Sequence, residues 1–155
     1  MNILDNISKV FKKYWPNLVL KNKQIDVISS YLNGNDTIGL LPTGYGKSMC
    51  YILPALVTDK VVFIISPLIS LMEDQREKLE IMKIPVATLH GNNINKNKEI
   101  AEIVEGKINI VFMSPEFLID GDGLSLADKL FKKDRLRFLA IDESHCISAW
   151  GHDFR

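Results

Sequence analysis

The feature that most constrains the fold of this chain is a glycine-rich turn at residues 41–48, with the sequence LPTGYGKS. It follows a short apolar run at residues 37–41, which predicts a strand, and it precedes a helix predicted over residues 46–57. A phosphate-binding loop requires this order of strand, loop and helix. Backbone amides of the turn and the positive end of the helix then face one small volume, which favours a bound anion.

The residue types in the turn suit contact with a phosphate chain. Gly44 and Gly46 permit backbone angles that other residues avoid. Lys47 is placed to reach the β- and γ-phosphates of a nucleotide, and the Ser48 hydroxyl suits a Mg²⁺ ion. Tyr45 either lies over the nucleotide or is an exposed loop residue. The candidate nucleotide-binding residues are Thr43, Gly44, Tyr45, Gly46, Lys47 and Ser48.

The rest of the chain alternates between strand-like and helix-like segments, which predicts an α/β fold with a parallel sheet covered by helices on both faces. The run VVFII at residues 61–65 shows no polar alternation, as is typical of a strand buried on both faces. Further strands are predicted at residues 86–89, 108–113 and 138–141. Helices are predicted at residues 5–14, 22–32, 67–82, 96–104 and 124–131.

Two neighbouring carboxylates, Asp142 and Glu143, follow the last predicted strand. Ligands of open α/β sheets bind beyond the carboxyl ends of the strands, so we expect this pair to face the same crevice as the glycine-rich turn. Phosphoryl transfer to water needs a metal and an oriented water molecule. Asp142 suits Mg²⁺ binding, and Glu143 suits a general base. Without the glycine-rich turn, two solvated acids at a strand end would be the simpler interpretation.

The overall charge balance gives no argument for nucleic-acid binding. Lys+Arg and Asp+Glu both number 19, so any such contact depends on local patches. Cys50 and Cys146 are too few for a disulfide framework and are interpreted as reduced, buried thiols. The N-terminus is no secretory signal and no apolar run is long enough to span a membrane. We therefore expect a soluble intracellular protein, in the cytoplasm or nucleus.

Other residues receive plainer interpretations. His90 is interpreted as a polar surface residue, and the basic run at residues 129–137 as a solvated helix face, with contact to a DNA backbone as the alternative. The apolar residues of the helix at 67–82 are predicted to form a core stripe that includes Leu68, Leu71, Leu79 and Met82.

Several segments resemble motifs of the RecQ family of DNA helicases. The closing segment at residues 140–155, AIDESHCISAWGHDFR, resembles motif II of that family and its aromatic-rich loop, which RNA helicases of the DEAD-box type lack. Residues 41–51 are similar to motif I and residues 65–75 to motif Ia. Residues 112–118 resemble the motif that comes next, and residues 20–24 resemble motif 0, with lysine at position 21 where the family has arginine.

The resemblance implies a RecA-like domain that binds ATP and Mg²⁺ and acts on single-stranded DNA and duplex junctions with 3′ to 5′ polarity. It implies that Gln24, assisted by Lys21, recognises adenine. It also implies a set of residues that contact DNA or couple its binding to ATP hydrolysis. These residues are Ser66, Pro67, Ser114, His145, Trp150, His152, Phe154 and Arg155.

The resemblance also suggests how the chain is organised. Residues 1–155 are expected to form one RecA-like domain, with motif 0 helices over about residues 1–34 and the P-loop core over residues 37–155, ending after the aromatic-rich loop. A second RecA-like domain, absent from this chain, would supply arginines for catalysis. We therefore expect the chain alone to bind ATP–Mg²⁺ but to hydrolyse it poorly. The alternatives are a non-hydrolysing nucleotide-binding module acting through a partner, and an RNA helicase domain.

Overall fold

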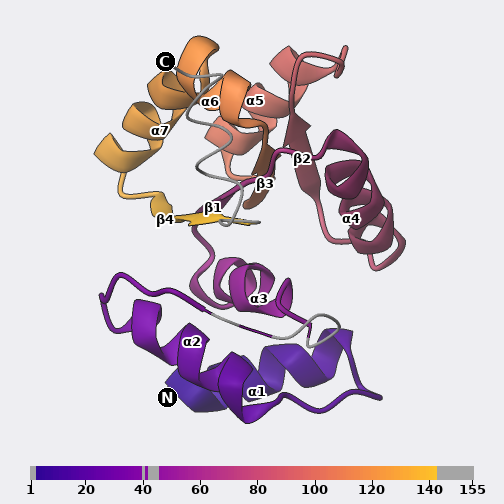
Figure 1. Cartoon of the computed structure of the whole chain (residues 1–155), viewed down its shortest axis with the longest axis vertical. Coiled ribbons are helices and arrows are strands. Elements are labelled where there is room, and N and C mark those ends of the chain that lie inside the picture. Colours follow the sequence, from indigo (N-terminus) through magenta and orange to yellow (C-terminus); the bar gives the residue numbers. More distant parts are fainter. Residues whose placement is uncertain (1–2, 40, 42–45, 143–155) are drawn as a thin grey trace. The chain divides into compact units, whose positions relative to one another are not determined.

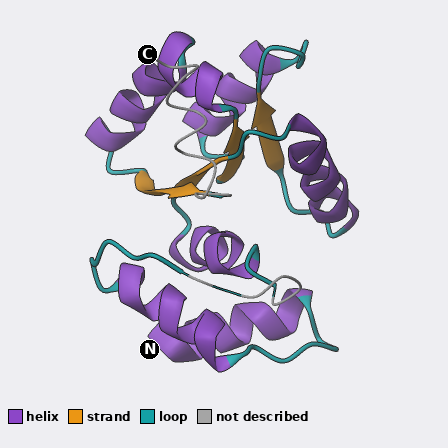
Figure 2. Ribbon diagram, viewed as in Figure 1, coloured by secondary structure: helices purple, strands orange, loops and turns teal. Residues whose placement is uncertain are grey.

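The computed structural model describes residues 3–39, 41 and 46–142 (Figure 1). The chain divides into two compact units, residues 1–59 and residues 60–155. The described elements of the first, called here the helical unit, are α-helices (Figure 2). The second, called the sheet unit, contains parallel strands and helices.

The helical unit is built from α1 (Ile3–Tyr14), α2 (Asn22–Leu32) and α3 (Met49–Thr58). The first helix ends just before Pro16, as predicted. Each helix contributes two residues to one buried cluster, namely Ile7, Phe11, Ile28, Leu32, Cys50 and Leu53. Because Cys50 lies in the first turn of α3, this core fixes the start of α3, the helix that follows the glycine-rich turn.

The sheet unit contains β1 (Val61–Ile65), β2 (Val86–Leu89), β3 (Ile110–Met113) and β4 (Leu136–Ile141). The strands are parallel and lie in the order β2-β3-β1-β4. The connecting helices are α4 (Ile69–Ile81), α5 (Lys96–Glu105), α6 (Pro115–Asp120) and α7 (Gly123–Lys132). The predicted α/β fold with a parallel sheet is therefore confirmed.

Helices pack against both faces of this sheet. On one face, Ile103 of α5, Phe117 of α6 and Leu130 of α7 join a cluster with alternate strand residues such as Phe63 and Val111. On the other face, the Thr88 side chain of β2 contacts two residues of α4. Figure 1 shows α4 and α7 on opposite sides of the sheet. Burial from both sides explains why β1 is apolar along its whole length.

Two local predictions were wrong. The segment predicted as a strand at residues 37–41 forms no strand over its described residues. Instead, Thr37 Oγ1 donates a hydrogen bond to Ser30 Oγ of α2 over 2.8 Å, and Ile38 is 87% exposed. A strand gains its stability from paired neighbours, and these residues lie along a helix. The short helix α6 was not predicted at all.

The predicted core stripe of α4 was also partly wrong. Leu68 and Leu71 are exposed, whereas Met72 and Leu79 are buried. Met72 and Leu79 are seven residues apart and so share one face of the helix. Leu71 is turned about 100° from Met72, and Leu68 precedes the first helical residue, so neither follows that face.

Helix α4 ends in a turn with a left-handed residue that is not glycine. Lys83 has φ 61°, its amide donates to Glu80 O over 2.9 Å, and the Ile84 amide donates to Leu79 O over 3.0 Å. This pattern is a Schellman motif, and the buried Leu79 and Ile84 supply its apolar contact. The left-handed conformation costs a residue with a Cβ about 1–2 kcal/mol.

We predict that Lys83→Gly increases the free energy of unfolding by about 0.5–1 kcal/mol, because glycine removes the left-handed strain. The matched control is Lys78→Gly, an exposed site within α4, which should decrease it by about 1 kcal/mol. Urea denaturation measures both values. Equal effects of the two substitutions would contradict the assignment of strain to Lys83.

Candidate functional site

The start of α3 is shaped as an anion-binding turn. Gly46 has φ 83°, and the amides of Met49 and Cys50 donate to Gly46 O and Lys47 O over 3.1 and 3.0 Å. Lys47 is exposed, and the Ser48 hydroxyl makes no capping hydrogen bond to the helix. The helix N-terminus, a lysine and a hydroxyl that does not cap the helix therefore lie within three residues, which suits a phosphate group and its metal ion. Thr43, Gly44 and Tyr45 lie outside the described residues.

Gln24 joins α2 to this turn. Its side chain is 4% exposed, its Oε1 accepts from the Lys21 amide over 2.9 Å, and its Nε2 donates to Gly46 O over 2.8 Å. The structure thus places two residues predicted for adenine, Lys21 and Gln24, beside the predicted phosphate turn. Their role in adenine recognition stays a prediction. The bond from Gln24 to Gly46 was not foreseen, because it joins residues 22 positions apart.

The Cys50 thiol takes no part in such chemistry. Burial raises its pKa to about 11, so the thiol stays protonated at neutral pH. The prediction that Cys50 is a core residue is confirmed. Cys146 lies outside the described residues.

In the sheet unit, three predicted site residues lie in one row at the carboxyl edge of the sheet. Each donates its backbone amide to the last residue of a neighbouring strand. The bonds are Ser114 N to Leu89 O (3.1 Å), Ser66 N to Met113 O (3.0 Å) and Asp142 N to Ile65 O (2.9 Å). The sheet order therefore brings together residues that are far apart in the sequence. Glu143, His145, Trp150, His152, Phe154 and Arg155 lie outside the described residues.

The two serines of this row are buried and shape the backbone around them. Ser114 Oγ accepts from the Phe117 amide over 3.1 Å and caps α6, while Ser66 Oγ accepts from the Leu68 amide over 3.4 Å. Pro67 is half-buried between Ser66 and α4. Because both serines are buried, a ligand at this edge would first meet backbone groups and neighbouring side chains.

His90, at the end of β2, was predicted as a surface residue, and this was wrong. It is 3% exposed, its Nε2 lies 2.9 Å from Glu73 Oε1, and its Nδ1 lies 3.2 Å from the Asn92 amide. The sequence places His90 before a polar loop, but α4 covers it. Its partner Glu73 lies 17 residues away in the chain, so the residues next to His90 could not indicate this contact.

A network of polar side chains extends from His90 across β2. Arg76 Nη1 donates to Thr88 Oγ1 over 2.6 Å, and Thr88 Oγ1 donates to Glu73 Oε1 over 2.8 Å. Arg76 Nη2 also pairs with Glu99 Oε1 of α5 over 2.6 Å. The network thus ties α4, β2 and α5 together behind the carboxyl edge.

The pKa values of the two carboxylates of this network are shifted in opposite directions. Burial raises the pKa of Glu73, but hydrogen bonds from His90 and Thr88 and the charge of Arg76 outweigh it, so the pKa is lowered. Glu99 is more deeply buried, and burial raises its pKa despite the charge of Arg76 and the hydrogen bond from Asn93.

Sequence comparison places this geometry in a family. The model for DEAD/DEAH box helicases matches residues 21–155, which include Lys21, the glycine-rich turn and the acidic pair. The chain belongs to the DEAD/DEAH box helicase family. This family assignment implies ATP binding.

Individual relatives are named as DNA or RNA helicases. The chain is 42% identical over 137 residues to a probable ATP-dependent DNA helicase RecS of Bacillus subtilis, covering 87% of this chain and 27% of the relative. It is 38% identical over 134 residues to the ATP-dependent DNA helicase RecQ of Haemophilus influenzae, covering 85% and 21%. It is 39% identical over 149 residues to a putative ATP-dependent RNA helicase R290 of Acanthamoeba polyphaga mimivirus, covering 96% and 27%. The chain therefore spans about a quarter of these relatives.

No helix in the described part of this helicase chain is long and apolar enough to cross a membrane.

We predict that Gly46→Ala destabilises the turn and weakens ATP binding. Alanine would adopt φ 83° at a cost of about 1–2 kcal/mol. Its Cβ would also lie 2.7 Å from Gln24 Nε2, so the Gln24 side chain would have to release Gly46 O. The control is Gly34→Ala, where φ is 92° but no atom lies within 4 Å of the new Cβ. Both variants should lose stability in urea denaturation, and only Gly46→Ala should also lose nucleotide affinity.

We predict opposite pH effects for the carboxylates of Glu73 and Glu99. The lowered pKa of Glu73 stabilises the fold above the ordinary value of 4.5, and this contribution is lost as pH falls below it. Glu73→Gln should therefore flatten the acid limb of the stability curve. The raised pKa of Glu99 destabilises the fold as pH rises above 4.5, so Glu99→Gln should remove a loss at higher pH. Urea denaturation between about pH 3 and 7 tests both, and slopes that change in the same direction would contradict the assignment.

Proposed function

We propose that this chain is the ATP-binding motor part of an ATP-dependent 3′ to 5′ DNA helicase of RecQ type. The observation that carries the proposal is the turn at Gly46–Ser48, which leads into α3. The turn is left-handed at Gly46, and Gly46 O accepts a hydrogen bond from Gln24 of α2. It is supported by the names of relatives such as the RecQ and RecS helicases. The helical and sheet units together would form one RecA-like domain.

In this proposal the helical unit holds the nucleotide. Backbone amides at residues 43–47 and the N-terminus of α3 would bind the phosphates, with Lys47 neutralising charge on the β- and γ-groups. Gln24 and Lys21 would recognise adenine. Thr43, Gly44 and Tyr45 complete the proposed turn.

Hydrolysis would depend on a metal ion and on a group that activates the attacking water. A bound Mg²⁺ ion would neutralise charge on the phosphate oxygens, and Ser48 and Asp142 are the proposed protein ligands. No group of three or more His, Cys, Asp or Glu in the described part of the chain is placed to hold a metal ion. The pair Ser48 and Asp142 suits Mg²⁺, because this ion keeps water and phosphate ligands beside one or two protein groups. Glu143 would take the proton of the attacking water as general base.

Single-stranded DNA would bind along the carboxyl edge of the sheet. The segment at Ser66–Pro67 and the backbone after Ser114 are the proposed contacts with the DNA backbone. Trp150, His152, Phe154 and Arg155 are proposed to sense bases through stacking, which is worth about 1–3 kcal/mol per base. His145 would couple this loop to the ATP site. The relative named as an RNA helicase keeps RNA as the competing substrate.

We predict that the chain binds a fluorescent ATP analogue in the presence of Mg²⁺. Lys47→Ala should weaken this binding at least about tenfold, because it removes the positive charge that would contact the phosphates. Glu143→Gln should keep the affinity, since the general base contributes to the reaction rather than to binding. Fluorescence titration measures both. Equal affinities of the wild type and Lys47→Ala would refute the proposed nucleotide site.

The same proteins allow a test of substrate. ATP turnover is measured without nucleic acid, with single-stranded DNA and with single-stranded RNA of the same sequence. Stimulation by DNA alone that Glu143→Gln abolishes supports the RecQ-type proposal. Stronger stimulation by RNA would favour the RNA helicase, and nucleotide binding with no turnover under any condition would favour the non-hydrolysing module.

A further inference from the structure

The last turn of α7 presents a surface that neither the fold nor the proposed ATP site accounts for. Phe131 is 73% exposed, and Leu124, two turns earlier, is exposed beside it. Seven residues separate them, so both lie on one face of the helix. The opposite face supplies the buried Leu126 and Leu130. The core therefore gives no reason for an aromatic residue at position 131.

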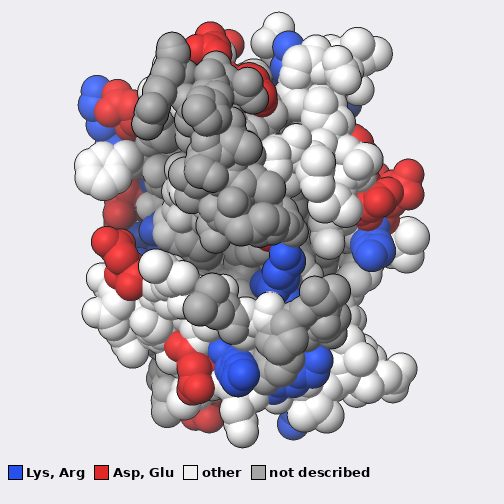
Figure 3. Space-filling model, in the orientation of Figure 1, with Lys and Arg blue, Asp and Glu red and all other residues white. Residues whose placement is uncertain are grey.

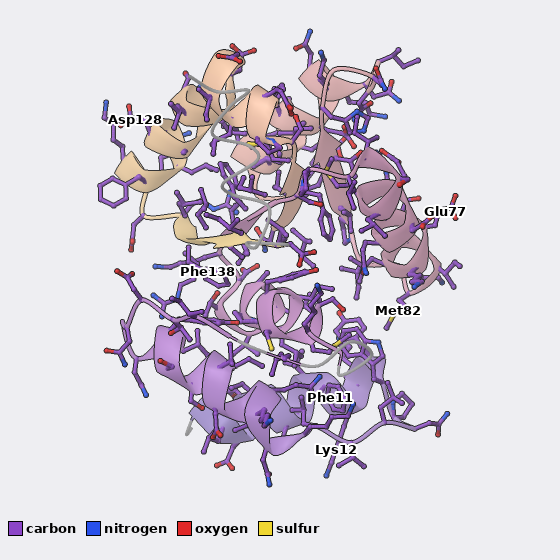
Figure 4. All side chains as sticks on the ribbon, viewed as in Figure 1. Phe11, Lys12, Glu77, Met82, Asp128 and Phe138 are labelled. Atoms are coloured by element: carbon purple, nitrogen blue, oxygen red, sulfur yellow. The ribbon has the colours of Figure 1, made fainter. Side chains whose placement is uncertain are left out.

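Three exposed lysines, Lys129, Lys132 and Lys133, surround this ring in the sequence. Lys132 pairs with Asp128 over 3.0 Å on the helix surface, and Figure 4 shows Asp128 on the outward side of α7. Lys129 and Lys133 make no ion pair with any described residue. Residues 128–137 hold five basic and two acidic side chains, an excess of three positive charges in a chain whose net charge is zero.

Two other charged residues near this surface contact other parts of the sheet unit. Arg135 Nη2 donates to Asn109 Oδ1 over 2.9 Å, and its Nη1 donates to Ile103 O over 3.2 Å. Asp134 pairs with Lys60 over 3.2 Å. The helix dipole favours lysines at this end of α7, but it does not favour an exposed phenylalanine.

The location separates this surface from the proposed DNA track. Residues 133–135 lead into the start of β4, so the last turn of α7 lies at the amino edge of the sheet. Ser66, Ser114 and Asp142 lie at the carboxyl edge. A strand of six residues spans about 20 Å, which sets the scale of the separation. In the view of Figure 3, basic and acidic side chains are interspersed over the described surface, so no single sign of charge covers this face.

We propose that Phe131, with Lys129, Lys132 and Lys133, forms a second contact for single-stranded nucleic acid at the amino edge of the sheet. An exposed ring offers a stacking surface to an unpaired base of any sequence, and neighbouring lysines attract the phosphates on either side. Charge complementarity selects a polyanion as the occupant, and the flat ring selects one that carries bases. The site goes beyond the proposed function, since ATP binding does not depend on it.

The experiment measures binding of a fluorescent oligothymidylate of about 20 nucleotides to the full chain by anisotropy, over a series of salt concentrations. Phe131→Ala is expected to lower the affinity about tenfold through loss of one stacked base. The triple variant K129Q/K132Q/K133Q is expected to reduce the slope of log affinity against log salt by about 2, since each phosphate contact on a single strand contributes about 0.7.

The matched control is K9Q/K12Q/K13Q, which removes three exposed lysines from α1 and the same total charge. It is expected to leave the slope nearly unchanged, and circular dichroism checks that all variants fold. Equal slopes for the two triple variants would mean general charge attraction and overturn the proposal. So would unchanged affinity in Phe131→Ala, or binding of an acidic phenylalanine-containing peptide at this surface while oligonucleotide binding stays unaffected.

Failure of the proposed ATP site would be visible separately. Nucleotide binding is measured on the same variants and is expected to match the wild type. Lys47→Ala, in turn, is expected to lose nucleotide affinity and to keep the salt-dependent contribution of the α7 surface.

Discussion

Parallel pairing of four strands is the constraint on which the sheet unit depends. Because all strands run in one direction, all their carboxyl ends meet at one edge. There, the residue after β1, β3 or β4 donates its amide to the last residue of a neighbouring strand. Asp142 and the proposed DNA contacts at Ser66 and Ser114 therefore need no special loop structure to come together. The price in sequence is that the strands must be apolar on both faces, as VVFII in β1 is.

The helical unit uses a different principle, since its site is the end of one helix. Two of the three helices hold α3 in place through apolar contacts, and α2 also reaches the turn through the Gln24 amide. A helix terminus carries unpaired amides whatever its sequence. The specific contribution of this sequence is therefore the backbone shape before the helix, set at Gly46, and the two polar side chains that follow it.

The sequence predicted the features whose causes are local or periodic. The strands at 61–65 and 86–89 appear with the predicted bounds, because each is a short apolar run between turn residues. The buried state of His90 and the bond from Gln24 to Gly46 could not be predicted, because each depends on a partner brought near only by tertiary packing. The failed strand at 37–41 has the same cause: an apolar run becomes a strand only where a neighbour accepts its hydrogen bonds. The adenine, metal and DNA roles stay predictions.

The two outer strands of the sheet hold their ends in different ways. At β2, the polar network of Arg76, Glu73 and Glu99 braces the strand from two helices, so His90 is fixed from several sides. At β4, the register with β1 shifts between Val61 and Val62, at the amino end of the strand, and is regular at the carboxyl end. Asp142 follows this regular end, and its amide donates to Ile65 O over 2.9 Å. The backbone of the carboxylate proposed for the metal is therefore held in register with β1.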